Sequence, residues 1–202
     1  MNLTEFFLAR HANTVWNSER RFQGQKDSPL SPEGIRQSKA FSKTLDEIKP
    51  DVIVTSKLMR AKETARHAIE NTKKDYLVFE YEELNESAFG PWEGMKLEDV
   101  KRDYREAFEK HRNAPHLFSM AGAETYTQVQ TRAIKGIKRI ARDFPEKRVL
   151  VVTHGLTLLC ILGYIRNIPL DIIRDKIDIP GNTEYIKIDW FEDGNEKCQK
   201  QD

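Results

Sequence analysis

The sequence is poor in cysteine and has no excess of charge of one sign. Only 2 cysteines occur among its 202 residues, Cys160 in an apolar run and Cys198 in a polar tail. They cannot build a disulfide framework or a zinc ribbon, which predicts a reducing, cytoplasmic environment. Lys and Arg number 33 and Asp and Glu 32, for a net charge of +1. This balance provides no electrostatic footprint for nucleic acid or an anionic membrane, so neither is expected as a partner.

Long apolar runs and glycine-rich phosphate loops are also missing. The most apolar stretch, residues 149–165, is interrupted by Thr153, His154 and Gly155. It therefore favours a buried strand followed by a buried helix over a membrane span. The first residues, MNLTEFFLARH, lack a basic leader followed by a long apolar stretch, so no signal peptide is expected. The patterns GxGxxG and GxxxxGK[ST] are absent, which excludes the two best-known phosphate loops.

Apolar runs of strand length alternate with segments of helical periodicity. The predicted strands are residues 4–9, 51–56, 77–81, 148–153 and, at one edge, 183–190. The predicted helices cover residues 35–48, 58–69, 97–108, 129–144 and 155–165. This alternation predicts an α/β fold, a three-layer α/β/α sandwich with a mostly parallel central sheet. We expect a single domain over residues 1–202, with a helical cap at about 83–147.

Chemically versatile side chains follow the predicted strands. Arg10 and His11 follow the first strand, and Arg60 comes shortly after the second. Glu86 follows the third strand and His154 the fourth. Ligands of open α/β sheets bind outside the carboxyl ends of the strands. The sequence therefore predicts that two histidines, two arginines and one glutamate meet in one crevice.

These five residue types suit phosphoryl transfer. The guanidinium groups of Arg10 and Arg60 can each give two parallel hydrogen bonds to a phosphoryl dianion. Their charges also favour a neutral His11, whose imidazole can attack phosphorus. His154 can donate a hydrogen bond to the phosphoryl oxygens, and Glu86 can protonate the leaving alkoxide.

Less specific interpretations exist for each residue taken alone. A histidine after a strand is more often a structural hydrogen-bonding residue than a nucleophile, and Arg60 alone resembles a solvated helix residue. A metal site built from His11, His154 and Glu86 is disfavoured, because two adjacent guanidinium groups would repel a divalent cation. Since the arginines already supply positive charge, we expect no metal and no other cofactor.

The order of these residues matches a known family. The segment LARHANTVWN at residues 8–17 resembles the signature Arg-His-Gly-x-Thr-x-x-Asn of the histidine phosphatase superfamily, the phosphoglycerate-mutase-like proteins. The similarity continues in RFQGQ (21–25), DSPLSPEG (27–34), SKLMRAKETA (56–65), LNE (84–86), FGPWEG (89–94) and VVTHG (151–155). It covers roughly residues 3–190 and is weakest within the cap.

The resemblance implies a role for each matching residue. His11 would become a phosphohistidine, and Glu86 would donate a proton and then activate water. The phosphate pocket would be formed by Arg10, Arg60 and His154. Asn17 and Gln23 would hydrogen-bond the transferred phosphoryl group, with the backbone of Gly24 beside it.

Two positions depart from the family pattern. Ala12 replaces the usual glycine, and alanine would be strained there if the position needed a positive φ. Leu156 follows His154 and Gly155 where a second small residue is common, so it is expected to narrow the pocket floor.

The resemblance implies a phosphatase that hydrolyses small phosphomonoesters through a covalent phosphohistidine. Its substrate would be a small phosphorylated metabolite. The alternative is a cofactor-dependent phosphoglycerate mutase, and a third hypothesis is a non-catalytic module that binds a phosphorylated ligand. Mutases of this family usually carry a longer cap, and the 67 residues between Glu86 and His154 favour a compact phosphatase. The sequence indicates no particular oligomeric state or physiological substrate.

Overall fold

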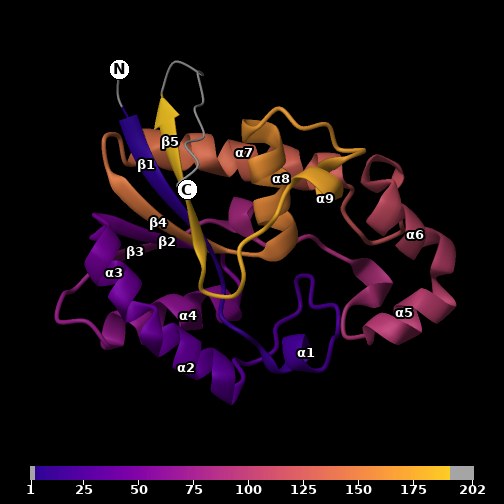
Figure 1. The fold of residues 1–202 in the computed structure, drawn as a ribbon, viewed down its shortest axis with the longest axis horizontal. Coiled ribbons are helices and arrows are strands. Elements are labelled where there is room, and N and C mark those ends of the chain that lie inside the picture. Colours follow the sequence, from indigo (N-terminus) through magenta and orange to yellow (C-terminus); the bar gives the residue numbers. More distant parts are fainter. Residues whose placement is uncertain (1–2, 192–202) are drawn as a thin grey trace.

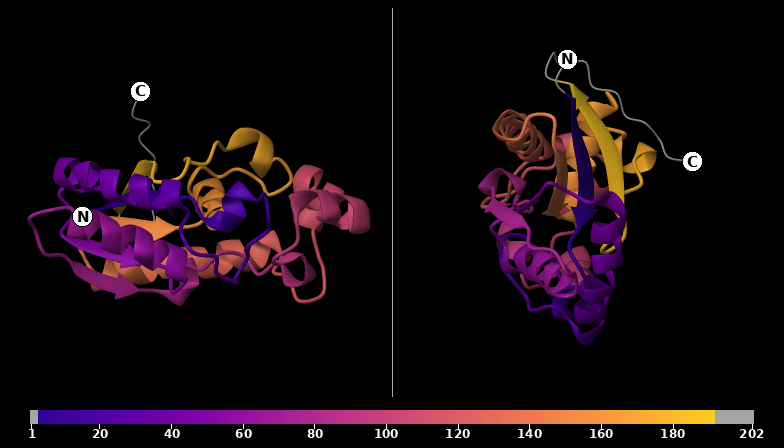
Figure 2. Two further views of the ribbon diagram at one scale, coloured as in Figure 1. Left: turned by 90° about the horizontal axis from the view of Figure 1, so that it is seen from below. Right: turned by 90° about the vertical axis from the view of Figure 1, so that its left-hand side faces the viewer.

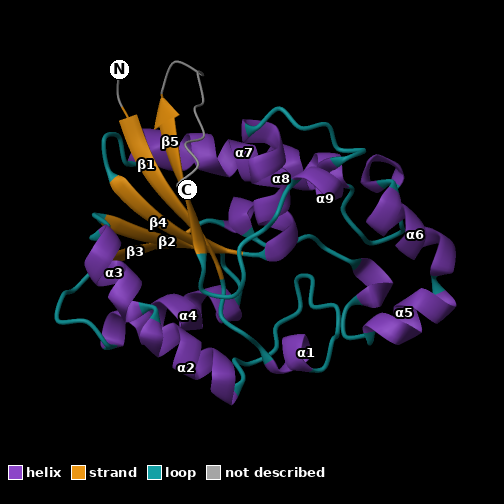
Figure 3. Ribbon diagram, viewed as in Figure 1, coloured by secondary structure: helices purple, strands orange, loops and turns teal. Residues whose placement is uncertain are grey.

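A five-stranded sheet forms the centre of the molecule. The computed structural model describes residues 3–191. The strands lie in the order β3-β2-β4-β1-β5, with β1 to β4 parallel and β5 antiparallel to β1 (Figures 1 and 3). Their bounds are β1 Leu3–Arg10, β2 Val52–Thr55, β3 Leu77–Glu80, β4 Arg148–Thr153 and β5 Tyr185–Phe191. The predicted mostly parallel sheet is confirmed, including the edge position of the last strand.

The central strands are apolar on both faces. In β1, Phe6 and Leu8 belong to one buried cluster, and Phe7 and Ala9 to another. Successive side chains of a strand point to opposite faces of the sheet, so a strand covered on both sides needs apolar residues at consecutive positions. The continuous apolar runs of the sequence therefore mark strands that are buried between two layers.

Helices cover both faces of the sheet (Figure 2). The cluster that includes Phe7 and Ala9 is completed by α3 (Ser42–Ile48), α4 (Met59–Glu70) and Phe41, which follows α2 (Pro32–Ala40). On the other face, α7 (Tyr126–Asp143) and α8 (Gly155–Ile165) pack against each other and the strands. The predicted three-layer architecture is confirmed. Within residues 3–191, no helix is both long enough and apolar enough to cross a bilayer.

Two predicted helices are each divided in the structure. The helix expected over residues 35–48 is divided at Phe41 into α2 and α3. The helix expected over residues 97–108 is divided at Tyr104, whose φ of −128° and ψ of 38° lie outside the helical region, into α5 (Leu97–Asp103) and α6 (Arg105–Asn113). α3, α5 and α6 bury apolar residues, whereas α2 buries Gly34 and Ser38 and is followed by the buried Phe41. The hydrophobic periodicity therefore continues across each break. Two four-residue helices, α1 (Val15–Ser18) and α9 (Ile173–Lys176), were not predicted.

The segment between β3 and β4 is more varied than a single cap. It contains α5, α6 and α7 and the short 3-10 helices η1 (Glu82–Leu84), η2 (Gly90–Trp92) and η3 (Pro115–Leu117). Figure 1 shows α5 and α6 beyond the end of the sheet. In contrast, α7 packs on α8 as part of the helical layer that covers one face of the sheet. Of residues 83–147, expected as one cap, it is thus α5, α6 and their flanking turns that project from the layers.

An aromatic cluster fills the projecting part. Trp92 is fully buried, and its ring centroid lies 5.0 Å from that of Phe22 and 5.3 Å from that of Phe118. His111 packs edge-on against Trp92 at 5.5 Å. The hydroxyl group of Tyr126, at the start of α7, lies 3.2 Å from His111 Nδ1. The cluster therefore packs α6 against α7, which belongs to the helical layer on one face of the sheet.

Candidate active site

His11 lies directly after β1, in a fixed and buried position. Its side chain and backbone together are only 3% exposed. Its N–H donates to Thr153 O over 2.9 Å, and its carbonyl accepts from Asn182 Nδ2. The ring atom Nδ1 lies 2.7 Å from Ala12 O. A carbonyl oxygen can only accept, so Nδ1 carries the proton and Nε2 keeps a free lone pair.

The surroundings of His11 keep its ring neutral. Burial, followed by the positive charges of Arg60 and Arg10, lowers the pKa of His11 well below its usual range. The hydrogen bond to Ala12 O opposes these effects without overcoming them. At neutral pH the imidazole is therefore uncharged, with a free lone pair on Nε2.

Arg60 lies in the first turn of α4, with its side chain 1% exposed. Its guanidinium group is held by the loop that follows α1. Nη2 donates to Gly24 O over 2.7 Å, and Nη1 donates to Lys26 O and Asp27 Oδ1, each over 2.9 Å. These contacts fix the plane of the guanidinium group. They leave Nε buried and without a hydrogen-bond partner among the described residues.

Arg10 is the last residue of β1, and its guanidinium group lies beside the start of α8. A Cβ atom added to Gly155 would stand 3.7 Å from Arg10 Nε and Cζ, which is ordinary van der Waals contact and places the guanidinium group beside this residue. Burial lowers the pKa of Arg10, and the charge of Glu86 partly offsets this. Its Nε is also buried and lacks a partner within residues 3–191.

His154 directly follows β4, is the N-cap residue of α8 and is fully buried. Its ring centroid lies 5.1 Å from that of His11. Parallel strands bring the two histidines together, because Arg10 and Thr153 are register partners at the ends of β1 and β4. Burial, then the charge of Arg60, lowers the pKa of His154 well below its usual range, so this ring is neutral too.

Ser56 determines which nitrogen of His154 carries the proton. The Ser56 hydroxyl lies 2.7 Å from His154 Nε2 and accepts a hydrogen bond from Leu58 N. Among the described residues, His154 Nε2 is the acceptor that its single proton can reach. Ser56 therefore donates to Nε2, and the ring proton resides on Nδ1. That nitrogen is buried and has no partner in residues 3–191.

Several buried polar atoms of the candidate site lack a hydrogen-bond partner. Arg10 Nε, Arg60 Nε and His154 Nδ1 are three buried donors without an acceptor in the described residues. The amide oxygen of Gln23, which is an acceptor, is also buried without a partner in the described residues. Buried polar groups in folded proteins are almost always hydrogen-bonded, so such a group of donors indicates a binding site for an acceptor-rich ligand.

Glu86 is held by the first turn of α8. Its Oε2 accepts from Leu156 N over 3.2 Å, and its Oε1 accepts from Thr157 N over 3.2 Å. The N–H of Ser87 and the hydroxyl of Thr157 also donate to Oε1. A helix N-terminus offers free N–H groups and a favourable dipole to a carboxylate. The helix that begins after His154 therefore also positions Glu86.

Three residues were assigned a role by family resemblance alone. Asn17 lies in α1, and Gln23 and Gly24 lie in the loop that follows it. Asn17 closes a capping box, in which its Oδ1 accepts from the N–H and hydroxyl of Thr14, and its Nδ2 donates to no atom of residues 3–191. Gly24 has a φ of +60°, and its carbonyl accepts from Arg60. The backbone angle favours glycine, and a Cβ atom here would stand 2.2 Å from Glu93 Oε1, so the Glu93 side chain would have to move. Gln23 is buried beside it.

Comparisons with known proteins agree with this geometry. The family model of the histidine phosphatase superfamily, branch 1, matches residues 6–201. The chain belongs to this superfamily. An uncharacterized phosphatase, PhoE, from Bacillus subtilis is 31% identical over 81% of this chain and 78% of its own. A metal-independent phosphoserine phosphatase from Arabidopsis thaliana is 32% identical over 81% of this chain and 68% of its own.

Solved structures of superfamily members have the same fold. YhfR from Bacillus stearothermophilus superposes with a TM-score of 0.90 at 30% identity, covering 96% of this chain and 95% of its own. Relatives named as probable phosphoglycerate mutases also match the chain. Membership of this superfamily confirms the expectation of a phosphatase-type enzyme, and phosphatases and mutases occur among its relatives.

The structure describes the two positions that depart from the superfamily pattern. Ala12 is not among the residues with a positive φ, and its N–H donates to Thr64 Oγ1 over 2.9 Å. The strain that a positive φ would impose on alanine is therefore absent. Leu156 is buried in the larger apolar cluster, and its N–H holds Glu86.

Several side chains that support the site were given no role by the sequence alone. Ser56 and Asp27 lie within the family motifs and could have been singled out there. Arg132 and Glu124 come from the α7 region and form an ion pair with a separation of 2.7 Å. The sequence carries no signal for this pair, because their contacts to the Glu86 loop depend on the packing of α7.

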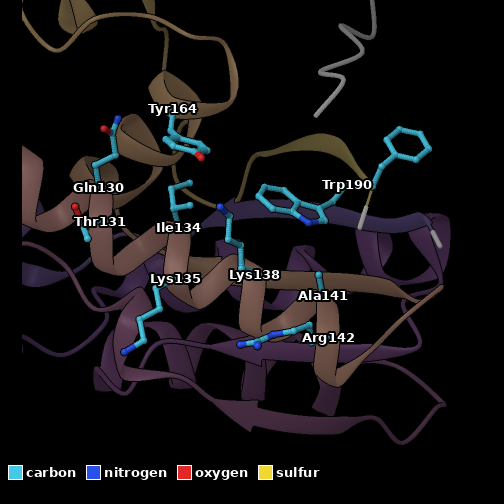
Figure 4. Close-up of a pocket in the computed structure, with 10 residues that line it drawn as sticks. Gln130, Thr131, Ile134, Lys135, Lys138, Ala141, Arg142, Tyr164 and Trp190 are labelled. Atoms are coloured by element: carbon cyan, nitrogen blue, oxygen red, sulfur yellow. The ribbon is translucent and has the colours of Figure 1, made fainter. Parts of the chain in front are cut away.

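A separate hollow lies between α7, α8 and β5 (Figure 4). It has a volume of about 650 Å³, and its lining includes the α7 side chains Lys135 and Lys138. Tyr164 of α8 and Trp190 of β5 complete an aromatic and basic surface. None of the predicted site residues of this histidine phosphatase lines the hollow, which is therefore distinct from the candidate site around His11.

Proposed function

We propose that the protein is a phosphomonoesterase that works through a covalent phosphohistidine at His11. The observation that carries this proposal is the group of unpartnered donors around a neutral imidazole. Arg10 Nε, Arg60 Nε and His154 Nδ1 can donate to phosphoryl oxygens, and His11 Nε2 has a free lone pair. The site therefore offers both a nucleophile and a preformed anion pocket.

In the first step, His11 Nε2 attacks phosphorus and the ester P–O bond breaks. The electron pair of that bond goes to the leaving oxygen, which takes a proton from Glu86. The donors of Arg10, Arg60 and His154 stabilise the negative charge on the transferring phosphoryl oxygens. The Asn17 Nδ2 group, Gln23 and the backbone at Gly24 complete the phosphoryl pocket.

In the second step, water hydrolyses the phosphohistidine. Glu86, now ionised, accepts a proton from the attacking water, and the N–P bond breaks. Phosphate leaves, His11 returns to its neutral form with the proton on Nδ1, and Glu86 is protonated again. The Ala12 carbonyl holds that tautomer throughout the cycle.

The proposed substrate is a small phosphorylated metabolite, and the proposed catalytic unit is a single domain. The projecting α5–α6 region is short, which supports a phosphatase over the alternative of a phosphoglycerate mutase. A neutral overall charge supports the absence of a nucleic-acid or membrane partner. A cytoplasmic location stays a prediction from the cysteine content.

Release of inorganic phosphate tests this proposal. The purified protein should hydrolyse p-nitrophenyl phosphate and a panel of sugar, amino-acid and nucleoside monophosphates, and prior treatment with a chelator should leave the rate unchanged. The arginines already supply the charge that a metal would supply. Interconversion of phosphoglycerates without phosphate release would favour the mutase, and binding without turnover would favour a non-catalytic module.

A further inference from the structure

We propose that Arg132 and Glu124 form a clamp that positions the Glu86 loop for proton donation. The Glu86 loop is defined as residues 83–88, which contain the proposed acid. The inference rests on the proposed function, because it assigns the clamp to the proton-transfer step of that reaction. Arg132 and Glu124 are positioning residues, since they touch the loop and not the reacting atoms.

The clamp holds the loop on both sides of Glu86. On the N-terminal side, Arg132 Nη1 donates to Glu83 O over 2.9 Å and to Asn85 O over 2.7 Å. On the C-terminal side, Ala88 N donates to Glu124 Oε2 over 2.9 Å, and Glu124 N donates to Ala88 O over 2.9 Å. Hydrogen bonds therefore hold the backbone in place on both sides of Glu86, the proposed acid.

A two-point ion pair joins these halves. Arg132 Nε donates to Glu124 Oε1 over 2.7 Å, and Arg132 Nη2 donates to Glu124 Oε2 over 2.9 Å. Burial works to raise the pKa of Glu124, but the hydrogen bonds from Arg132 and Ala88 N outweigh it and hold the pKa below its usual range. Glu124 therefore stays ionised at neutral pH, and the pair stays charge-assisted.

The clamp sets the loop against a rigid element. Arg132 lies within the 18-residue helix α7, which packs on α8. The first turn of α8 holds the Glu86 carboxylate through Leu156 N and Thr157 N. The backbone of the loop is thus fixed to one helix and its carboxylate to the neighbouring helix. Loss of the clamp would let the backbone of the Glu86 loop move while α8 still held the carboxylate.

Guanidinium geometry is required at residue 132. Nη1 of Arg132 donates to the two loop carbonyls, and its Nε and Nη2 donate to the two carboxylate oxygens of Glu124. A lysine ammonium group is a single nitrogen and cannot span these acceptors. Arg132→Lys should therefore fail to restore function, although it keeps the positive charge.

Leaving-group dependence separates a positioning role from a merely structural one. An alkyl phosphate needs its leaving oxygen protonated, whereas p-nitrophenyl phosphate has a good leaving group and needs little help. Phosphoryl transfer is measured under single-turnover conditions, with enzyme in excess, by the alcohol or phenol released. Arg132→Met should slow transfer from the alkyl phosphate about 10-fold more than from p-nitrophenyl phosphate. Arg132→Lys should show the same selectivity as Arg132→Met, and Glu124→Gln should show it to a smaller degree.

The matched control is Arg142→Met, which removes an exposed arginine from the same helix. It should change neither rate. Melting temperatures confirm that each variant is folded at the assay temperature, and Glu124→Gln keeps the side-chain shape should Arg132→Met fail to fold. Because the clamp acts through Glu86, adding Arg132→Met to Glu86→Gln should cause little further loss with the alkyl phosphate.

The outcomes distinguish this inference from the proposed function. Selectivity in both Glu86→Gln and the clamp variants, without additivity, supports the clamp. Selectivity in Glu86→Gln alone, or full additivity, overturns the clamp and leaves the acid assignment standing. Equal slowing of both substrates in Glu86→Gln overturns the acid assignment and the clamp together.

Discussion

Two buried neutral histidines carry the ring proton on Nδ1, with different consequences. His11 donates a hydrogen bond from Nδ1 to the Ala12 carbonyl, which leaves the lone pair of Nε2 free to act as the proposed nucleophile. His154 receives a hydrogen bond at Nε2 from Ser56, which leaves its Nδ1 proton for a ligand. One hydrogen bond to each ring thus determines whether it can attack or donate.

Ser56→Ala should reduce phosphoryl transfer by disturbing the tautomer of His154. Without the hydroxyl donor, the ring proton can move to Nε2, and the pocket loses the Nδ1 donor. Loss of one such donor typically costs about 10²–10³-fold in rate, and partial population of the other tautomer should cost about 10-fold. Single-turnover kinetics give the rate, and the ¹⁵N chemical shifts of the His154 ring report the tautomer.

The control for Ser56→Ala is Ser119→Ala, which alters an exposed serine. It should leave the rate and the ring signals unchanged. Wild-type tautomer signals and a wild-type rate in Ser56→Ala would show that Ser56 does not direct the ring proton.

At the scale of elements, the loop after α1 and the start of α4 stabilise each other. Asp27 pairs with the buried Arg60 side chain and also accepts from Met59 N over 2.8 Å. The N-cap residue of α4, Leu58, gives no side-chain hydrogen bond to the helix. Asp27 therefore caps a helix to which it does not belong, and it orients an arginine of the proposed phosphoryl pocket.

Asp27→Ala should lower the free energy of unfolding by about 2 kcal/mol, from one lost cap and one charge-assisted hydrogen bond. Asp27→Asn should cost less, because its amide oxygen can still accept from Met59 N. Urea denaturation measures both. The exposed α3 variant Asp46→Ala should stay within about 0.5 kcal/mol of the wild type, and an equally small loss in Asp27→Ala would refute the capping role.

Element boundaries show how far the sequence could predict this fold. The strand at Arg148–Thr153 matches its predicted range, because five apolar or β-branched residues follow one another between two helical layers. The breaks at Phe41 and Tyr104 were missed, since both aromatic side chains pack into the interior and preserve the periodicity. The four-residue helices α1 and α9 are too short for hydrophobic periodicity to reveal.

At the scale of the whole molecule, the fold buries three neutral histidines. Burial is the largest cause that lowers the pKa of His11, of His154 and of His111. The unfolded chain binds protons at these residues below about pH 6.5, whereas the folded chain does not. Their contribution to stability is therefore complete above pH 6.5 and is lost as the pH falls toward their lowered folded-state pKa values.

The free energy of unfolding should thus fall between pH 6.5 and pH 5, by roughly 1 kcal/mol per pH unit for each of the three histidines. Urea denaturation at a series of pH values measures this slope. Since the unfolded pKa values of carboxylates lie near 4, they contribute little in this window. His111→Gln should make the slope shallower, and a flat profile from pH 7 to pH 5 would contradict the burial of neutral rings.

The site itself was predictable to the extent that it lies in contiguous motifs at strand ends. His11, Arg60 and His154 follow strands whose carboxyl ends meet, so the sequence placed them in one crevice. Arg132 and Glu124 were not predictable, because their contacts with the Glu86 loop arise from the packing of α7. His111 lies outside the motifs of the candidate site and is buried in the aromatic cluster of the projecting region.

The central claim is that His11 forms a phosphohistidine. The most direct measurement is rapid quenching of the enzyme with ³²P-labelled substrate, followed by peptide mapping of the label. We predict an acid-labile, base-stable label on His11, no label in His11→Ala, and normal labelling in the variant His116→Ala, which alters an exposed histidine. Turnover of the substrate by His11→Ala at the wild-type rate, or a label on another residue, would contradict the account.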